Sequence, residues 1–576
     1  MAIPTQAIVA GCLQSAFHQE LNYFLENRVL ERLWAKDDTL WPQEEFEHSH
    51  IRSNLCWLDL PGSLEPFLSA IKQEESSATA DGLDCRVLVT FEGANLGARA
   101  LMAFVPHDDD TRRMVVLDST SPVAISQVEQ EIDLERSLFI FASKAGYRLE
   151  DHALFLYFRE RLQAAGAPRQ LRQFVAQTEP GSYLATIGRE YNFRATFTDL
   201  PGILARFSTL KHLGTVLVAR FAMEPEAIIA AAQASHQACS PGTIPSQNPA
   251  LQLAALLSSA ASAKREYLAL LATPALVPFT HCLSQLIGGS MAKEGPGLIP
   301  IAGDVPRDTH ALEDKAVFAV LTHAGDADPE LSDLMSRFRF SGVPFVHVQL
   351  AEPLDLLAET FGWQVATVLA CARLGLDPFE GLDDRLPRAF AMELLNNYSP
   401  ANDTLRRRPR IHEGNLQLFA EGKTRRELSA LNLQESLGSF FRLLQPDSFL
   451  GVLVFLPQTP GVVTAFQAIR RELTEKLNAP VLMVNGPRAL YHYSHLRREG
   501  RPQGQYLVCT ADPPADISIP GASYSFGQLY RALALGEFEG LEQSHRFVIR
   551  INLTGEIAAA LAMLEHTIGQ ALSRTQ

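Results

Sequence analysis

Short apolar runs rich in β-branched residues recur along the chain and constrain its fold more than any other feature. The first three are RVLVTFEG (86–93), MVVLDS (114–119) and SLFIFAS (137–143). Segments with helical periodicity, including 149–166, lie between and after these runs. Strands that are apolar on both faces are typical of parallel sheets covered by helices on each side. The sequence therefore predicts an α/β protein built on doubly wound parallel sheets.

A second set of such runs follows a Pro/Ser/Gln-containing linker near 235–250, so a second α/β domain is expected. Its expected strands are 316–322, 344–350, 449–457, 480–486 and 505–511.

The segments around these strands are expected to cover them. Residues 1–60 indicate helix and carry three of the four tryptophans, which favours a segment that packs aromatic rings on a larger body. The polar stretch 76–84 is expected to be a loop. The segment 385–435, with its basic run LRRRPR (405–410), is expected to pass over the surface, and a helix over 555–572 is expected to close the chain.

Charge and cysteine usage exclude several classes of function. The formal net charge of -15 disfavours a nucleic-acid or anionic-membrane partner. The apolar stretch 251–272 contains Lys264, Arg265 and Glu266, so it is not expected to span a membrane. Seven single cysteines show no CxxC or Cys/His cluster, which predicts no metal site and a reducing compartment. The N-terminus lacks a secretion signal, so the cytoplasm is the expected location.

The turns after the strands are where a ligand should bind, because doubly wound sheets bind ligands beyond the carboxyl ends of their strands. The turn 143–148 precedes a helix, and Ser143 and Lys144 add a donor and a charge to its positive end. An ordinary turn with a solvated lysine is the alternative. The turn 86–100 contains Gly93 and Gly97 but no dinucleotide fingerprint, so no cofactor is expected.

Three further segments carry charges that could face a ligand. Arg206 lies in an apolar segment, where a surface position with a buried stem is favoured over a pocket-facing one. The Gly-rich segment 284–301 has Lys293 and Glu294 as its only charges. The segment 485–504 is either a solvated basic loop or an anion grip. Its ring and cationic side chains are Tyr491, His492, Tyr493, His495, Arg497, Arg498 and Arg501.

Several segments together resemble the phosphoglucose isomerase (glucose-6-phosphate isomerase) family. They resemble most the isomerase part of bacterial bifunctional transaldolase/phosphoglucose isomerase proteins, without a transaldolase portion. The matching segments are ERLWAKDDTLWP (31–42), VVLDSTSP (115–122), FIFASKAG (139–146), GWQVATVLACARLGLDPF (362–379) and ISIPGASYSFGQLYRALALGEFEGL (517–541).

The resemblance implies two SIS-type domains with a sugar phosphate between them. The expected division is a helical, aromatic-rich wrapping segment (1–75), a first domain (76–245) and a second domain (246–576).

The resemblance also implies which positions should do the chemistry, and most of them have changed. Gly289 stands where the family has the glutamate that moves the proton between C1 and C2, so the usual base is missing. The phosphate loop becomes Ser143-Lys144-Ala145-Gly146-Tyr147-Arg148, and the turn that approaches the sugar becomes Glu92-Gly93-Ala94.

The remaining family positions have changed as well. The Gly-Gly-Arg motif becomes Leu204-Ala205-Arg206, and Arg388 replaces a lysine after Phe379-Glu380-Gly381-Leu382. Arg497 falls at the ring-opening histidine and cannot act as a neutral base.

Matching the chain to the motifs of this family gives the expected site residues and three hypotheses of function. The expected ligand-binding residues are Glu92, Gly93, Ser143, Lys144, Arg148, Arg206, Lys293, Arg388, Arg497 and Arg498. The first hypothesis is a non-catalytic family member, or pseudoenzyme, that binds a carbohydrate derivative or a sugar phosphate in the interdomain cleft. The second is an enzyme with new chemistry using His495, His492 or Glu294. The third is a pseudo-subunit or regulator that pairs with an active relative. The expected assembly is a homodimer or a complex with such a relative.

Overall fold

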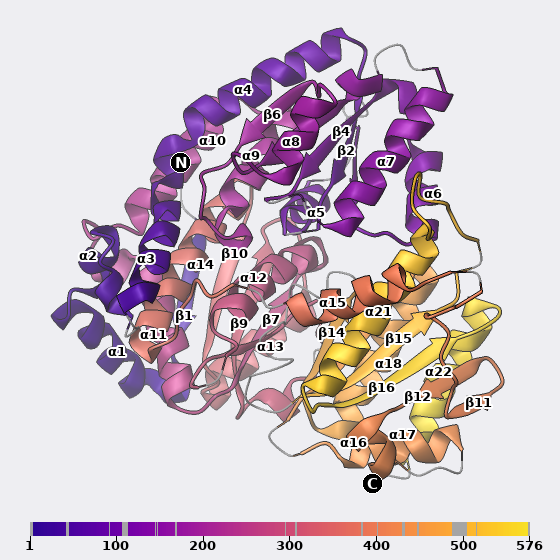
Figure 1. Cartoon of the computed structure of the whole chain (residues 1–576). Helices are drawn as coiled ribbons and strands as arrows, with labels where there is room; N and C mark the ends of the chain where they lie inside the picture. Colours follow the sequence, from indigo (N-terminus) through magenta and orange to yellow (C-terminus); the bar gives the residue numbers. More distant parts are fainter. Residues whose placement is uncertain are drawn as a thin grey trace.

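The computed structural model describes most of the chain. The described residues are 4–41, 45–91, 93–105, 113–144, 146, 148–166, 170–293, 295–303, 305, 308–381, 384–399, 401–428, 432–445, 448–486, 504–513 and 515–573. Three β-sheets flanked by helices make up this part of the molecule (Figure 1).

The first sheet is parallel throughout and is formed by the segment from 85 to 198. Its order is β3 (Arg113–Leu117), β2 (Cys85–Val89), β4 (Ser137–Ala142), β5 (Phe174–Thr178) and β6 (Ala195–Thr198). The helices that follow its strands, together with the next one along the chain, are α5 (Ala94–Phe104), α6 (Pro122–Glu131), α7 (Leu149–Ala164), α8 (Tyr183–Glu190) and α9 (Thr209–Ala219). Every residue of β2, β4 and β5 is buried, as expected for strands covered on both faces.

The second sheet is parallel except for one edge strand. Its order is β1 (Thr5–Val9), β10 (Phe345–Leu350), β9 (Ala316–His323), β7 (Tyr267–Ala272) and β8 (Ile299–Ile301), with β1 antiparallel to β10. Its helices are α10 (Pro225–Ala238), α11 (Pro249–Ser262), α12 (Val277–Ser290), α13 (Pro329–Ser341) and α14 (Pro353–Leu374). The N-terminal helices α1 (Gln14–Glu26), α2 (Val29–Trp34), α3 (Glu45–Asn54) and α4 (Leu60–Ala80) run along one side of the first two sheets (Figure 1).

The third sheet occupies the C-terminal part of the chain. Its order is β11 (Ile411–Glu413), β12 (Leu416–Phe419), β16 (Phe547–Leu553), β15 (Gln505–Ala511), β13 (Leu450–Phe455) and β14 (Val481–Asn485). Strands β13 to β16 are parallel, and β12 is antiparallel to β16. Its helices are α15 (Arg385–Asn396), α16 (Gly422–Glu427), α17 (Leu433–Arg442), α18 (Pro460–Leu477), α21 (Phe526–Gln543) and α22 (Ile557–Ser573).

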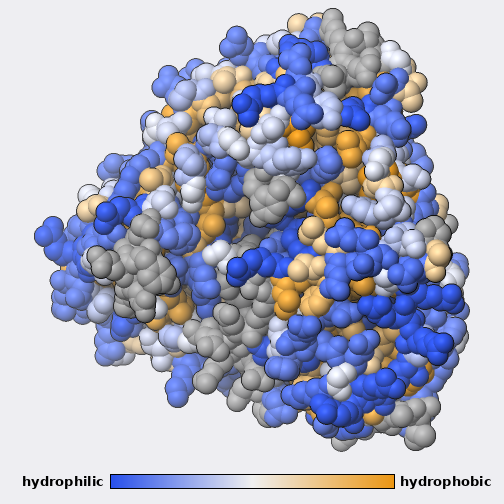
Figure 2. All heavy atoms as spheres, viewed as in Figure 1, coloured by the Kyte–Doolittle hydropathy of each residue, from blue (hydrophilic) through white to orange (hydrophobic). Residues whose placement is uncertain are grey.

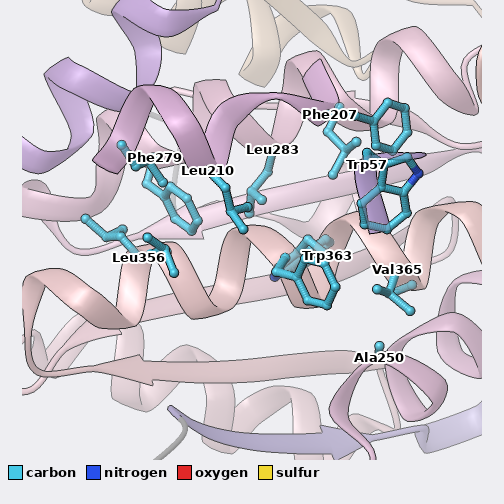
Figure 3. Close-up of a cluster of buried hydrophobic side chains, with 14 of the residues drawn as sticks. Trp57, Phe207, Leu210, Ala250, Phe279, Leu283, Leu356, Trp363 and Val365 are labelled. Atoms are coloured by element: carbon cyan, nitrogen blue, oxygen red, sulfur yellow. The ribbon is translucent and has the colours of Figure 1, made fainter. Parts of the chain in front are cut away.

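Large apolar side chains of α14 pack in a core shared with the N-terminal helices and the first two sheets. Trp363 has no exposed surface, and the ring centroid of Trp57 lies 5.3 Å from that of Phe207 (Figure 3). The ring centroid of Phe361 on α14 lies 5.5 Å from that of Trp57. Buried aromatic pairs of this kind bury much apolar area and hold a specific geometry. The N-terminal segment is thereby fixed to the first two sheets, as its aromatic content predicts.

The predicted fold class is confirmed: the chain is an α/β protein with parallel sheets. The number of sheets differs from the expectation, because the strands 449–457, 480–486 and 505–511 form a sheet of their own instead of extending the second one. The segment 385–435 is also more than a surface excursion. It contributes the strands β11 and β12 to the third sheet and the helices α15 and α16 beside it.

Two local predictions were wrong. Most of the stretch 76–84 is helical, because α4 continues to Ala80. The N-terminal segment is also not purely helical, since Thr5–Val9 forms the edge strand β1. The division of the chain at 75 and 245 stays a prediction.

The exterior is mainly hydrophilic on the face shown in Figure 2, with smaller apolar areas between polar side chains. Among the residues that the structure describes, no helix is both long and apolar enough to cross a lipid bilayer.

Candidate functional site

The position expected for the catalytic base lies at the C-terminal end of α12, against the side chain of Arg206. A Cβ atom placed on Gly289 would lie 3.1 Å from Cδ and 3.2 Å from Nε of Arg206. Arg206 is 5% exposed, so the preferred prediction of a surface position was wrong. The side chain of Arg206 therefore lies in tight contact with the point where a side chain at position 289 would begin.

Arg206 is held by oxygens of the loop that follows α14. Its Nη2 donates to the carbonyl oxygens of Pro378 and Glu380, both at 2.8 Å, and its Nε donates to Oγ of Ser290 at 3.1 Å. Burial lowers the pKa of Arg206 to about 10, although the charges of Asp377 and Glu380 act in the opposite direction. The arginine thus ties the segment 204–208 to the end of α12.

Lys293 reaches the same loop. Its Nζ donates to the carbonyl oxygen of Asp377 and lies 2.7 Å from a carboxylate oxygen of Glu380. Arg206 and Lys293, which the sequence placed in separate turns, are therefore brought together by residues 377–380. The charge of Lys293 is already matched by a carboxylate.

The turn after β2 is closed by a side chain of α12. Gly93 has φ of +106°, and a Cβ atom there would lie 2.3 Å from Oε1 of Gln285. Only glycine fits this position without moving Gln285. The family resemblance assigns sugar contact to this turn, but in this chain the buried amide of Gln285 packs against it. The turn itself ends sooner than expected, because Gly97 lies inside α5.

The turn after β4 keeps two of the donors expected in the phosphate loop. Ser143 is buried, and its Oγ accepts a hydrogen bond from the backbone N–H of Gly146 at 3.3 Å. Nζ of Lys144 lies 2.8 Å from a carboxylate oxygen of Glu179, so the alternative of a fully solvated lysine does not hold. An anion at this turn would share Lys144 with Glu179 or displace it.

The N-terminus of α7 is occupied by carboxylates of the chain itself. Glu150 and Asp151 lie in its first turn, and both are buried. Glu150 accepts two hydrogen bonds of 3.0 Å from Arg388 on α15. Negative charge is favourable at the positive end of a helix. Glu150 thus takes the position where the sequence analysis expected a bound anion.

Arg148 and Arg388, both expected to hold a ligand, converge on Asp384. Nε of Arg388 donates to Asp384 at 2.7 Å, and Nη1 of Arg148 lies 3.8 Å from the same carboxylate oxygen. Burial alone would raise the pKa of Glu150, but the charge and hydrogen bonds of Arg388 hold it below its ordinary value. These four residues form an ion cluster between α7 and α15, which we call the Glu150 cluster.

The remaining predicted site residues lie outside the described residues. They are Glu92, Glu294, Tyr491, His492, Tyr493, His495, Arg497, Arg498 and Arg501. The hypothesis of new chemistry depends on several of them. It stays a prediction, as does the hypothesis of a pseudo-subunit or regulator. Within the described part of the chain, no group of three or more His, Cys, Asp or Glu side chains is arranged to hold a metal ion.

Sequence reasoning missed the acidic partners of the predicted cations. Glu150 and Asp384 were not selected, although the Glu-Asp pair directly after the β4 turn is a sign of carboxylates at a helix N-terminus. No local pattern marks Gln285 or Glu179, because their partners are distant in the sequence.

Comparisons with known proteins agree with the resemblance drawn from the sequence. The chain is 26% identical over 273 residues to a probable glucose-6-phosphate isomerase of Natronomonas pharaonis, covering 46% of this chain and 60% of that protein. It is 27% identical over 306 residues to the glucose-6-phosphate isomerase of Streptococcus pyogenes, covering 50% of this chain and 65% of that protein. The matched region thus spans less than two thirds of the length of either relative. No protein-family model matches the chain.

Solved structures show the same fold. A hypothetical protein of Thermus thermophilus superposes with a TM-score of 0.56 at 17% identity, over 68% of this chain and 99% of that one. A glucose-6-phosphate isomerase of Chlamydia trachomatis superposes with a TM-score of 0.53 at 16% identity, over 66% of this chain and 86% of that one. The chain therefore has a fold shared with a glucose-6-phosphate isomerase.

Proposed function

We propose that this chain is a glucose-6-phosphate isomerase-like protein that binds a carbohydrate derivative or sugar phosphate without ordinary isomerase activity. The proposed binding site is the cleft between the first two sheets, beyond the carboxyl ends of β2 and β4. We place the protein in the cytoplasm, where its seven free cysteines would stay reduced.

The observation that carries the proposal is the contact between Gly289 and Arg206. A glycine side chain has no group that accepts a proton, and the side chain of a buried arginine is in tight contact with the point where a longer side chain would begin. A carboxylate base contributes about 10²–10⁴-fold to proton transfer. Without a carboxylate at position 289, the usual proton transfer between C1 and C2, which is the central step of aldose–ketose interconversion, has no base.

Ligand binding is supported by the residues that remain. Ser143 and Lys144 keep a donor and a charge at the end of β4, where ligands of such sheets bind. Lys144 is paired with Glu179 and Lys293 with Glu380, so an anionic ligand would exchange with a carboxylate instead of meeting a bare cation. This favours a weakly charged or remodelled sugar ligand over a tightly held phosphate.

The activity test measures interconversion of glucose 6-phosphate and fructose 6-phosphate by the purified chain, with the Streptococcus pyogenes enzyme as the positive control. We expect a rate at least about 10²–10⁴-fold below that enzyme. We also expect Gly289→Glu to remain inactive, because the new carboxylate would pair with Arg206. Gly381→Ala is the matched glycine control, since a Cβ there meets nothing within 4 Å. Turnover near that of the positive control would refute the proposal.

The binding test measures the shift in melting temperature with a panel of sugar phosphates, neutral sugars and amino sugars, since a ligand of the native state stabilises it. Lys144→Gln should remove the shift given by any phosphorylated ligand of the cleft. Lys72→Gln is the control, because Lys72 of α4 forms an ion pair with Glu224, the residue before α10, and not with a residue of the β4 turn. If no sugar in the panel shifts the wild-type protein, the binding part of the proposal fails.

A further inference from the structure

We infer that the third sheet carries a second ligand site, an arginine-lined pocket that binds a phosphorylated small molecule. The pocket has a volume of about 890 Å³ and lies between the segment 403–409, β12, β16 and α21. Its cationic lining residues are Arg406, Arg407, Arg408, Arg531 and Arg550. The proposal concerns a part of the molecule separate from the cleft and does not depend on the function proposed for it.

The centre of this arginine pocket is Arg550, an interior residue of β16. It is 6% exposed, and its Cζ lies 3.7 Å from the centre of the Phe419 ring on β12. Its Nη1 donates to Oγ1 of Thr510 at 3.1 Å. Its Nε is buried and has no hydrogen-bond partner among the described residues, and none of their carboxylates forms an ion pair with it. A buried guanidinium without a matching anion is costly.

The neighbours of Arg550 increase this excess of positive charge. Burial is the largest cause that lowers the pKa of Arg550, and the charges of Arg531 and Arg407 add to it, while the charges of Asp512 and Glu421 act in the opposite direction with smaller effect. Arg531 is paired with Asp512, and Arg407 lies 2.9 Å from Glu539. Arg406 and Arg408 are exposed side chains of the same rim, with no carboxylate partner in the described part of the chain.

The balance of charge in the pocket indicates an anion. Five arginines line it, and only two carboxylates do, Asp403 and Asp512. This local excess stands out because the chain as a whole carries a net charge of -15. Arginine donates paired hydrogen bonds in a planar fork that matches phosphate oxygens, which a single ammonium cannot do.

The place and size of the pocket favour a small molecule over a polymer. Asn552 is near the carboxyl end of β16, and Asp512 follows the carboxyl end of β15, where α/β sheets bind ligands. Sites for small molecules commonly enclose about 300–1,000 Å³. A nucleic acid would instead need a basic surface extending beyond one pocket, which the acidic chain disfavours.

The experiment titrates pyrophosphate and inorganic phosphate into the full chain by calorimetry at low ionic strength. We expect both to bind, with pyrophosphate tighter because it offers more charged oxygens. The double variant R406Q/R408Q, which changes only exposed side chains, should weaken pyrophosphate binding at least about tenfold through lost charge-assisted contacts. R471Q is the matched control, because Arg471 is an exposed arginine of α18 on the opposite face of the same sheet.

Arg550→Lys tests the buried centre of the pocket. It keeps the charge but loses the fork, so it should also weaken binding, while Lys144→Gln in the cleft should leave pyrophosphate binding unchanged. The proposal is overturned if wild type binds no pyrophosphate, if R406Q/R408Q binds it as tightly as R471Q, or if citrate binds more tightly than pyrophosphate. Binding of a mixed-sequence oligonucleotide without binding of pyrophosphate would also overturn it.

Discussion

Glu359 lies inside α14 and is one of the buried acids that no ion pair compensates in the described structure. It is 4% exposed, and Nε1 of Trp363 donates to its Oε2 at 3.2 Å. Burial raises the pKa of Glu359 to about 8, and the charge of Asp355 adds to the effect, while the hydrogen bond from Trp363 opposes it. At neutral pH the folded protein therefore holds this carboxyl group protonated, whereas the unfolded chain ionises it.

This difference predicts a stability that falls as pH rises. The contribution of protonated Glu359 to the free energy of unfolding is fully present below the unfolded pKa near 4.5. It is lost as pH rises through the folded pKa of about 8. Glu359→Gln should remove this loss, so at pH 8 the variant should be more stable than wild type by a few kcal/mol, at roughly 1.4 kcal/mol per pKa unit. Urea unfolding of both proteins at pH 5 and pH 8 measures it. Glu330→Gln, an exposed acid of α13, is the control; equal differences at both pH values would contradict the prediction.

At the residue scale, the sequence showed which motif positions are altered, but it did not show which side chains contact those positions. The lost base at Gly289 is visible in the sequence because a motif is expected there. The contact of Arg206 with that position is not visible, because it joins residues far apart in the chain. The contact of Gln285 with Gly93 is likewise not visible in the sequence, because the two residues are far apart in the chain. Motifs report which side chain is missing, whereas tertiary packing decides what replaces it.

The first turn of α7 shows the corresponding effect at the scale of an element. Glu150 has no exposed surface and joins α7 to Arg388 of α15. Glu150→Gln would leave Arg388 buried with Asp384 as its remaining partner in the Glu150 cluster, at a cost of about 3 kcal/mol in the free energy of unfolding. Chemical denaturation at pH 7 measures this loss. Glu160→Gln, an exposed acid later in α7, should cost less than about 0.5 kcal/mol.

The pH dependence of this pair has the opposite sign to that of Glu359. The folded pKa of Glu150 is lowered, so its contribution is present above the unfolded pKa and is lost as pH falls through the folded pKa. The difference in the free energy of unfolding between wild type and Glu150→Gln should therefore become smaller at acid pH. A difference that stays constant down to pH 3 would contradict the assignment of Glu150 as a buried, ionised partner.

Most strands that are continuous apolar runs were predicted, and strands that are not such runs were missed. Strand β7 is an exception, because its apolar run is part of the longer apolar stretch 251–272. Strands β2, β4, β9 and β13 are of the first kind, and each was located from the sequence. Strand β16 is of the second kind, because Arg550 and Asn552 interrupt its apolar run. Strand β6 alternates between partly buried and exposed residues, and β12 has only four residues. The polar residues that hid β16 are those that line the arginine pocket.

The three sheets are packed as one molecule through a shared apolar core. Buried side chains of the first sheet (Phe139), the second (Phe318) and the third (Val508) belong to one continuous cluster. The ring centroids of Tyr157 on α7 and Phe526 on α21 are 5.5 Å apart across the junction. A second cluster, which includes Leu437 of α17, lies only on the outer face of the third sheet.

This arrangement predicts that a defect in the third sheet destabilises the whole chain. Leu437→Ala should cost about 2–5 kcal/mol, because it leaves a cavity in a fully buried cluster. All four tryptophans, Trp34, Trp41, Trp57 and Trp363, lie outside the third sheet, so their fluorescence reports on the rest of the molecule. We expect the denaturation midpoints by fluorescence and by far-UV circular dichroism to fall together. A fall in the circular dichroism midpoint alone would show that the third sheet unfolds independently.

The edge strand β1 also sets an order of events during synthesis on the ribosome. Thr5–Val9 pairs with Phe345–Gln349, so the strand of this sheet that is translated first waits for the strand of the sheet that is translated last. At about 5–20 residues per second, this wait is on the order of tens of seconds. The first sheet, whose strands lie entirely within 85–198, can form during that time. A strand without its partner is prone to pair with other chains. A nascent chain of this protein therefore has a period in which a chaperone that binds its N-terminal segment would raise the yield of folded protein.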